Sequence, residues 1–414
     1  MSDDVMEVLQ RTFPKSVQPG LPKLKPPKPG WKSYRFGELL EQVQRRVHLQ
    51  PDETYDLVTV KRSRGGIESR GRLRGSQISV TSQFKIAEGD FLISKRQIVH
   101  GACGVVSSEF DGAVVSNEYS VLRCKPNIDL AFLQYLSHSV YFQQTCFHSS
   151  IGVHIEKMIF KLDEWFKWPV NIPSLPDQQK IAAFLGAVDA KLAALVAKQA
   201  ALVRFKAGLM QKLFSQQLRF TRDDGTAFPD WQEKQLGDLA QIVGGGTPES
   251  FIPEYWGGDI IWFTPTEIKS KYLQRSRRTI SAEGLKNSSA KLLPIGALLL
   301  STRATVGDVG IATAECCTNQ GFQSLIVKGA HNNEFLYYWL LNNKKAILRK
   351  ASGSTFLEIG KSEVVKLSVS VPHPDEQAKI ANALSTMDTK IQAVADQVAK
   401  LQTFKNGLLQ QMFV

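Results

Sequence analysis

The pattern of apolar and polar positions is most regular in two long segments, residues 178–215 and the last part of the chain. Alternating steps of four and three residues from Ile181, and likewise from Ile380, meet an apolar residue at nearly every position. This spacing is that of a coiled-coil seam and predicts two long helices. The predicted seam residues are Ile181, Leu185, Val188, Leu192, Leu195, Leu202, Leu209, Leu213, Ile380, Leu384, Met387, Ile391, Val394, Val398, Leu401, Leu408 and Met412.

Each seam needs a partner, and the matched segment of the same chain is the partner we expect. A pseudo-twofold axis perpendicular to the two rods would make the pair antiparallel. At about 1.5 Å per residue, residues 178–215 would form a rod of about 57 Å. The alternative is two separate amphipathic helices, each packed on its own domain. Lys206 and Lys405 interrupt both seams at the same register, where the pair could splay or meet another protein.

The two helices belong to a long internal repeat. Pro29-Gly30-Trp31 recurs as Pro229-Asp230-Trp231, and the segment from Gly89 to Arg96 recurs from Gly296 to Arg303. Pro176-Asp177-Gln178-Gln179 is matched with Pro374-Asp375-Glu376-Gln377 at an offset of 198, and from Ile181 the offset is a constant 199. The two halves are therefore expected to share one architecture.

The blocks before the helices combine short apolar runs, such as 55–60, 114–122, 260–263 and 324–327, with glycine-rich turns. They also contain short helical patterns, so each block is typical of an α+β domain. The predicted organisation is a short helix (about 3–12) and proline-rich linker in 1–28, a first domain in 29–173, a central long helix in 174–216, a linker in 217–228, a second domain in 229–372 and a C-terminal long helix in 373–414.

Composition limits the classes of function. The chain has 51 Lys and Arg against 39 Asp and Glu, a net charge of +12, and 43% hydrophobic residues, which indicates folded domains with an acidic partner such as nucleic acid. No apolar stretch approaches the roughly 18–20 residues needed to span a bilayer, and the acidic N-terminus is not a secretory signal. Five cysteines without CxxC or zinc-ligand spacing fit a reducing cytoplasm.

The excess cations gather in two glycine- or serine-containing segments, 61–74 and 269–278, which we interpret as flexible loops that contact DNA phosphates and guanine edges. Exposed solubilising loops are the alternative. Arg96 and Arg303 are matched by the repeat, and either DNA contact or pairing with a carboxylate would explain them. The predicted DNA-binding residues are Lys61, Arg62, Arg64, Arg70, Arg72, Arg74, Arg96, Lys269, Lys271, Arg275, Arg277, Arg278 and Arg303.

The segments that resemble catalytic motifs have residue spacings that do not fit those motifs. The segment ending Gly360-Lys361-Ser362 lacks the first glycine of a phosphate-binding loop. Asp189 with Lys191, and Asp388 with Lys390, resemble a metal-dependent nuclease pattern, but residues two apart on a helix point about 200° apart and cannot share a metal. We interpret them as parts of a solvated helix face. The sequence thus predicts no catalytic residue and no metal site.

The chain resembles the specificity subunit of type I restriction-modification systems over essentially residues 29–414. The resemblance rests on the near-identical helices and on Trp231, Leu236 to Leu239 and Gly245 to Pro248 in the second half; the first half has Phe36-Gly37-Glu38-Leu39 and no Gly-Thr-Pro. It implies two target recognition domains separated by two long helices that form an antiparallel coiled coil. Each domain would read one half of a bipartite DNA site, and the helix pair would fix the spacer.

The resemblance also implies the partners of the chain. Two modification subunits would dock on the helices and use S-adenosylmethionine to methylate adenine, and restriction subunits would use ATP and Mg²⁺ to translocate and cleave double-stranded DNA. The chain itself would bind no cofactor. The residues leave two other functions open, a stand-alone DNA-binding regulator and a coiled-coil scaffold for proteins.

Overall fold

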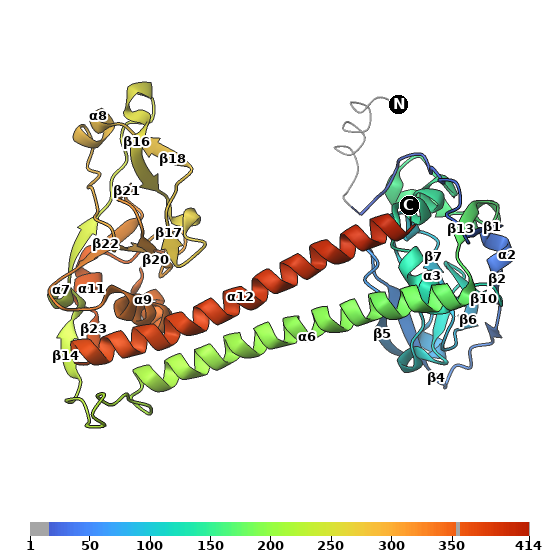
Figure 1. Cartoon of the computed structure of the whole chain (residues 1–414), viewed down its shortest axis with the longest axis horizontal. Helices are drawn as coiled ribbons and strands as arrows, with labels where there is room; N and C mark the ends of the chain where they lie inside the picture. The colour runs from blue at the N-terminus through green and yellow to red at the C-terminus, as the bar shows by residue number, and fades with distance from the viewer. Residues whose placement is uncertain (1–15, 353–356, 414) are drawn as a thin grey trace. The chain divides into compact units, whose positions relative to one another are not determined.

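A computed structural model of the chain describes residues 16–352 and 357–413, which fall into two compact units (Figure 1). Unit 1 comprises Met1–Leu195 and Gln397–Val414, and unit 2 comprises Val196–Asp396. Each of the two long helices, α6 (Leu175–Phe214) and α12 (Pro374–Phe413), contributes one part to each unit. The helix predicted near residues 3–12 lies outside the described residues.

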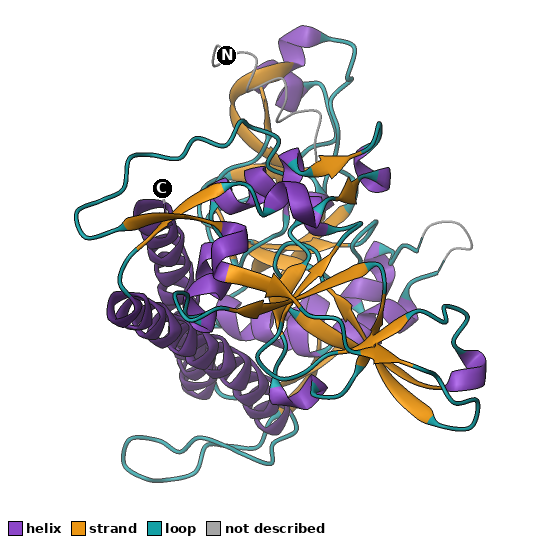
Figure 2. Ribbon diagram, turned by 90° about the vertical axis from the view of Figure 1, so that its right-hand side faces the viewer, coloured by secondary structure: helices purple, strands orange, loops and turns teal. Residues whose placement is uncertain are grey.

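Unit 1 combines short strands and short helices (Figure 2). Its strands form a four-stranded sheet in the order β2-β10-β7-β8, a five-stranded sheet in the order β3-β6-β9-β4-β5, and two two-stranded ribbons, β1-β13 and β11-β12. Its elements besides the long helices are β1 (Lys32–Arg35), α2 (Phe36–Leu39), β2 (Leu40–Gln42), β3 (Arg46–Val47), β4 (Thr54–Val60), β5 (Ile67–Arg74), β6 (Gln83–Lys85), β7 (Phe91–Ser94), β8 (Cys103–Val105), β9 (Val114–Ser116), β10 (Tyr119–Cys124), α3 (Leu130–Leu136), α4 (Val140–His148), β11 (Ser150–Ile151), β12 (Ile159–Phe160), α5 (Leu162–Trp165) and β13 (Pro169–Ile172).

Unit 2 contains a five-stranded sheet in the order β15-β22-β19-β20-β17, a three-stranded sheet in the order β18-β16-β21, and the ribbon β14-β23. Its elements besides the long helices are β14 (Gln232–Gln235), α7 (Leu236–Leu239), β15 (Ala240–Gly244), β16 (Trp256–Phe263), β17 (Tyr272–Leu273), β18 (Arg278–Ile280), α8 (Ala282–Lys286), β19 (Leu298–Ser301), β20 (Val309–Ala312), β21 (Cys316–Thr318), β22 (Phe322–Val327), α9 (Asn333–Asn342), α10 (Lys344–Lys350), α11 (Lys361–Val365) and β23 (Ser368–Val371).

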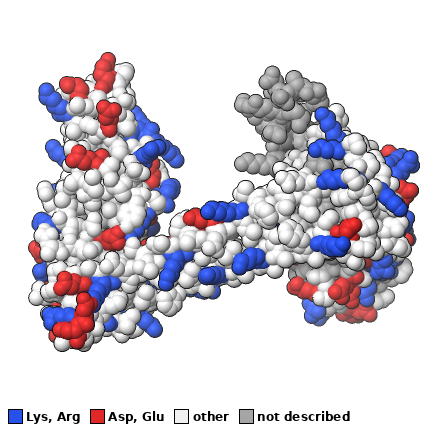
Figure 3. All heavy atoms as spheres, in the orientation of Figure 1, with Lys and Arg blue, Asp and Glu red and all other residues white. Residues whose placement is uncertain are grey.

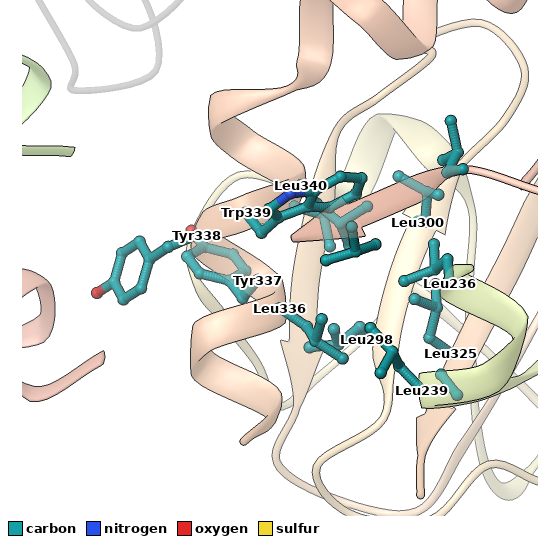
Figure 4. Packing of buried hydrophobic residues seen from close by; sticks show 14 of the residues in the cluster. Leu236, Leu239, Leu298, Leu300, Leu325, Leu336, Tyr337, Tyr338, Trp339 and Leu340 are labelled. Carbon is teal, nitrogen blue, oxygen red and sulfur yellow. The ribbon is translucent and has the colours of Figure 1, made fainter. Parts of the chain in front are cut away.

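The two units share one framework, which confirms the predicted fold class of two similar α+β domains. The order β2-β10-β7-β8 in unit 1 corresponds to β15-β22-β19-β20 in unit 2, and the ribbon β1-β13 corresponds to β14-β23. In unit 2, leucines of α7, β19 and β22 face the apolar side of α9 (Figure 4). The apolar run at residues 114–122 contains β9 and the start of β10, separated by a turn.

A buried glutamine fixes the start of each long helix. Gln178 Nε2 donates to the carbonyl of Pro173 (3.0 Å), and Gln377 Nε2 donates to the carbonyl of Pro372 (2.9 Å). Their Oε1 atoms accept from the backbone N–H of Asp129 and of Asn332. These two glutamines are 199 positions apart, so the offset of 198 predicted for the helix starts, which matched Gln178 with Glu376, was wrong by one residue.

The long helices pack antiparallel within each unit. In unit 1, Leu185 near the start of α6 shares a core with Phe413 at the end of α12. In unit 2, Leu213 near the end of α6 shares a core with Ile380 and Leu384 near the start of α12. None of the predicted seam residues is exposed. The antiparallel pairing is therefore seen in each unit by itself.

The two lysines that interrupt the predicted seams are paired with aspartates of the opposite helix. Lys206 Nζ lies 2.5 Å from an Asp388 carboxylate oxygen in unit 2, and Lys405 Nζ lies 2.5 Å from an Asp189 carboxylate oxygen in unit 1. The prediction that Asp189 and Asp388 belong to a solvated face is only partly right: their side chains are 38% and 34% exposed, but the opposite helix brings a cation to each of them.

Candidate nucleic-acid interface

The basic segment 61–74 is not a flexible loop, as predicted, but a turn followed by strand β5. β5 pairs antiparallel with β4 over its whole length and forms one edge of the five-stranded sheet. The prediction was wrong because the arginines alternate with residues that the β4–β5 ladder can accommodate. Edge strands commonly carry charged side chains, which hinder unwanted pairing and remain free for a ligand.

A β-bulge displays Arg70 on this edge. Leu57 pairs with Gly71 and Val58 with Ser69, so Arg70 is the extra residue of β5. Gly71 has φ of +95°, a conformation that favours glycine. Bulges re-aim side chains and occur often beside functional sites. Arg70 and Arg74 are exposed and form no ion pair within the described part of the chain, so both are available to an anion.

The other cations of the first segment already have neighbours. Lys61 pairs with Glu68 (2.5 Å), Arg62 with Glu156 (2.6 Å) and Arg72 with Asp56 (2.6 Å). These three pairs are at the surface, where such pairs contribute little to stability and are weakened by salt. Arg64 differs, because it is half-buried with φ of +59°, and burial lowers the pKa of its guanidinium.

In unit 2 the predicted cations divide in the same way. Lys269, Arg275 and Arg277 are exposed, and their side chains have no carboxylate partner among residues 16–352 and 357–413, although the backbone N–H of Arg277 donates to the Glu267 carboxylate (2.6 Å). Lys271 is only 11% exposed and lies 3.0 Å from Glu334, so it is a structural cation. Arg278 is exposed at the start of β18, and its guanidinium stacks 3.4 Å above the ring of Trp256.

Sequence reasoning missed Trp256, although two tryptophans within seven residues of one another beside a basic run are a usable signal. Trp256 is the first residue of β16 and Trp262 lies near its end, and both rings lie against Arg278. An arginine stacked on an aromatic ring keeps its N–H groups free in the plane of the guanidinium. This arrangement orders the Arg278 guanidinium and leaves its N–H groups available to an anion.

The two arginines matched by the repeat lie beside carboxylates. Arg96 pairs with Glu118 (2.5 Å), and Arg303 pairs with Glu358 (2.8 Å). Both arginines therefore pair with a carboxylate, which is one of the two explanations that the sequence left open. Their contact with DNA stays a prediction.

The glycine-rich segment after β15 closely approaches other backbone of its own unit. A Cβ atom on Gly245 would lie 2.0 Å from the carbonyl oxygen of Asn319, and one on Gly246 would lie 2.3 Å from the backbone nitrogen of Ala290. Trp262 Nε1 also donates to the carbonyl of Gly246 (2.9 Å). The glycines therefore allow this segment to pack beneath β16, the strand that carries Trp256.

Three of the exposed predicted cations, Arg70, Arg74 and Arg278, lie on sheets that the two units do not share. Arg70 and Arg74 belong to β5 of the five-stranded sheet in unit 1, and Arg278 belongs to β18 of the three-stranded sheet in unit 2. Lys and Arg are scattered among Asp, Glu and uncharged residues over the visible surface and do not coat it (Figure 3). One framework thus presents two different sets of side chains to a ligand.

Two further searches of the described residues bear on other classes of function. Residues 16–352 and 357–413 contain no cluster of three or more His, Cys, Asp or Glu side chains that could hold a metal ion. In the same residues, no helix combines the length and the apolar character that a membrane crossing requires. The five cysteines are free, and burial raises the pKa of Cys103 to about 11, which makes it a poor nucleophile.

Comparison with known proteins identifies what this framework is similar to. The model of the type I restriction modification DNA specificity domain matches residues 29–203 and again residues 229–403. The MjaIX specificity subunit, a type I restriction enzyme component of Methanocaldococcus jannaschii, is 36% identical over 208 residues, which are 47% of this chain and 48% of that protein. The chain therefore spans about half the length of this curated relative.

A longer but weaker match is the type I restriction enzyme HindI specificity subunit of Haemophilus influenzae, 22% identical over 83% of this chain and 90% of that protein. Among solved structures, the HsdS subunit from Thermoanaerobacter tengcongensis has a TM-score of 0.55 at 18% identity and covers 94% of this chain and 98% of that chain. At this identity the likeness shows the fold.

Proposed function

The chain belongs to the type I restriction modification DNA specificity domain family, and we propose that it is the DNA-reading subunit of a type I restriction-modification complex. Each unit would read one half of a bipartite double-stranded DNA site, and the α6–α12 pair would fix the spacer. The chain would contribute no catalytic residue. The complex would work in the cytoplasm.

One observation carries this proposal: the specificity domain occurs twice on one framework, and each copy adds a sheet of its own that carries exposed arginines, Arg70 and Arg74 in β5 and Arg278 in β18. Two readers that share a framework but differ in side chains are suited to two unlike half-sites. Half-sites on one face of a duplex lie about one helical turn apart, roughly 34 Å. Helix α6 has 40 residues, about 60 Å at 1.5 Å per residue, which is long enough to serve as a rigid spacer.

The partners would be two modification subunits, one for each copy of the repeat, joined by restriction subunits. S-adenosylmethionine for adenine methylation, and ATP and Mg²⁺ for restriction, would be used by those partners.

Phe205 and Phe404 support one docking site per copy. They are matched by the repeat, and despite their large apolar rings they are 61% and 50% exposed on α6 and α12. Exposed aromatic residues are common anchors of protein interfaces.

The decisive experiment is mapping of methylated adenines in DNA from cells that express this chain with its modification subunit. We expect one bipartite motif with a fixed gap. A continuous motif, or none in the assembled complex, would contradict the proposal. Tight and specific binding of one duplex by the chain alone would instead favour a stand-alone regulator.

Substitution of the free arginines should affect one half of the motif at a time. Arg70→Ala with Arg74→Ala should weaken complex binding to DNA and relax only the half read by unit 1, while Arg275→Ala with Arg277→Ala should relax only the other half. Removal of one phosphate-binding cation should reduce the slope of log affinity against log salt by about 0.9. The slope is measured by titration at several salt concentrations.

The matched control is Arg349→Ala with Lys350→Ala, which removes two exposed cations from framework helix α10. It should leave both half-sites and the salt slope close to those of the unaltered chain. An equal loss of affinity in the control would mean that the effect reflects total charge and not the position of the arginines.

Phe205→Ser and Phe404→Ser should each remove one modification subunit from the complex, and the double variant should remove both. Native mass spectrometry of the assembled complex counts the subunits. Val203→Ser is the control, since Val203 is equally exposed on α6 but lies about 200° around the helix from Phe205. Full assembly by the double variant would exclude these rings as docking anchors.

A further inference from the structure

Each unit contains a triad of tyrosine, aspartate and lysine that joins three elements. In unit 1, Asp189 of α6 accepts a hydrogen bond from the Tyr135 hydroxyl (2.9 Å) and pairs with Lys405 of α12 (2.5 Å). In unit 2, Asp388 of α12 accepts from the Tyr338 hydroxyl (2.5 Å) and pairs with Lys206 of α6 (2.5 Å). The tyrosine comes from α3 or α9, so each triad links both long helices to the body of its unit.

The lysines of the triads are largely withdrawn from water, whereas the side chains of Asp388 and Asp189 are 34% and 38% exposed. The side chains of Lys206 and Lys405 are 17% and 13% exposed, and each ammonium lies over the ring of its triad's tyrosine, at 5.0 Å from Tyr338 and 5.8 Å from Tyr135. Burial and the bond to the aspartate raise the pKa of both tyrosines, so both hydroxyls are protonated and donate. A lysine in such a place loses its hydration, and without its aspartate it would be a costly unpaired charge.

Both triads require the same alignment of the two helices. Asp189 and Lys206 are 17 positions apart on α6, and Asp388 and Lys405 are likewise 17 positions apart on α12 (206 minus 189 and 405 minus 388). In an antiparallel pair, equal spacings of this kind let both ion pairs form in a single register. A register that breaks one pair therefore breaks the other.

A slip of one heptad preserves the apolar seam but not the triads. Seven residues to either side of Asp388 stand Ala381 and Ala395, and seven residues to either side of Asp189 stand Ala182 and Val196. Each slipped lysine would thus face an apolar side chain in place of its aspartate. The seam itself repeats Leu, Val, Ile and Met every three to four residues, so it distinguishes poorly between registers.

We propose that the Tyr135–Asp189–Lys405 and Tyr338–Asp388–Lys206 triads determine the register of the α6–α12 pair. This inference rests on the proposed function for its consequence, which is that the triads set the spacer of the recognised site. A polar group in an apolar seam commonly specifies register at some cost in stability. The tyrosines extend this role, because they tie the register to α3 and α9 and hence to the two DNA-reading units.

The test removes the charges and keeps the shape. The quadruple variant Asp189→Asn, Lys405→Met, Asp388→Asn, Lys206→Met leaves each tyrosine hydroxyl an amide oxygen to donate to. Nitroxide labels on Ala183→Cys and Gln410→Cys, both exposed and both in unit 1, report the position of α12 along α6. Cys124, the one native cysteine that is not fully buried, is replaced by serine.

The unaltered triads should give one label distance by double electron–electron resonance. The quadruple variant should keep its helix content and thermal midpoint and show at least one more population, displaced by about 10 Å along the helix axis for a slip of seven residues. Lys191→Met with Lys390→Met, two exposed lysines outside the triads, should keep the single distance. A single unchanged distance in the quadruple variant would overturn the proposal.

Exchange of the partners gives a second measurement should the quadruple variant fail to fold. Lys206→Asp with Asp388→Lys, and Asp189→Lys with Lys405→Asp, should restore a single distance, whereas either half of an exchange alone should not.

The methylation map then separates the two proposals. Altered label distances without any bipartite motif would refute only the proposed function, whereas a variant with a fixed distance and one spacer length would refute the role of the triads.

Discussion

Replacement of Arg219 by methionine should lower the free energy of unfolding of unit 2 by about 3–5 kcal/mol, the usual cost of breaking a buried ion pair from one side. Arg219 follows α6, and its guanidinium bonds both oxygens of the fully buried Glu376 carboxylate in α12, at 3.1 and 2.8 Å. It also donates to the carbonyl of Pro229 (2.6 Å). Without Arg219, the carboxylate would retain only the Trp231 Nε1–H at 3.2 Å.

Native-state hydrogen exchange in urea measures this loss at amides of unit 2, where a single transition for the whole chain is not assured. Addition of Glu376→Gln to Arg219→Met should recover part of the loss, since the expense lies in the uncompensated charge. Lys379→Met breaks a neighbouring surface pair with Asp223 (2.6 Å) and should cost no more than about 1 kcal/mol. If Glu376→Gln recovered nothing, a packing role for Arg219 would explain the loss instead.

The features predicted well from sequence are those whose signal repeats along the chain. The seam from Ile181 and from Ile380 is a local pattern sustained over many turns, and every residue named in it is buried or half-buried. The helix-start offset was wrong by one residue, because similar letters around Pro176 and Pro374 concealed which glutamine makes the contacts. Gln178 and Gln377 are recognised only by their bonds to Pro173 and Pro372.

The features predicted poorly depend on partners far away in the sequence. Asp189 and Lys405 are 216 positions apart, and no local pattern shows that they meet (405 minus 189). The same holds for the basic segments: composition identified Arg70 and Lys271 equally, yet Arg70 is presented by a bulge while Lys271 is neutralised by Glu334. Which cations remain free for DNA is therefore a property of the fold and not of the local sequence.

His138→Gln should remove up to about 3 kcal/mol of the acid sensitivity of unit 1 between pH 6.5 and pH 4. His138 lies between α3 and α4, where burial, followed by the nearby charges of Arg64 and Lys405, lowers its pKa from 6.5 to about 4, against an opposing effect of Asp189. Above pH 6.5 the imidazole is neutral in both the folded and the unfolded chain. Between pH 6.5 and pH 4 the unfolded chain binds a proton that the folded chain excludes, so stability falls as the pH falls.

The difference in free energy of unfolding between the unaltered chain and His138→Gln, measured by hydrogen exchange at several pH values, isolates this effect from the titration of carboxylates. The difference should be constant above pH 6.5, should change steadily down to about pH 4 and should be constant again below it. His154→Gln, at an exposed histidine of the same unit, controls for the loss of one imidazole. In the Arg64→Met background, the difference should stop changing at a higher pH than about 4. Removal of the Arg64 charge raises the pKa of His138 in the folded state, which moves the lower limit of the pH-dependent range upward. A difference curve that stays flat from pH 7 to pH 4 would show that His138 is protonated equally well in the folded and the unfolded chain, and would contradict the prediction.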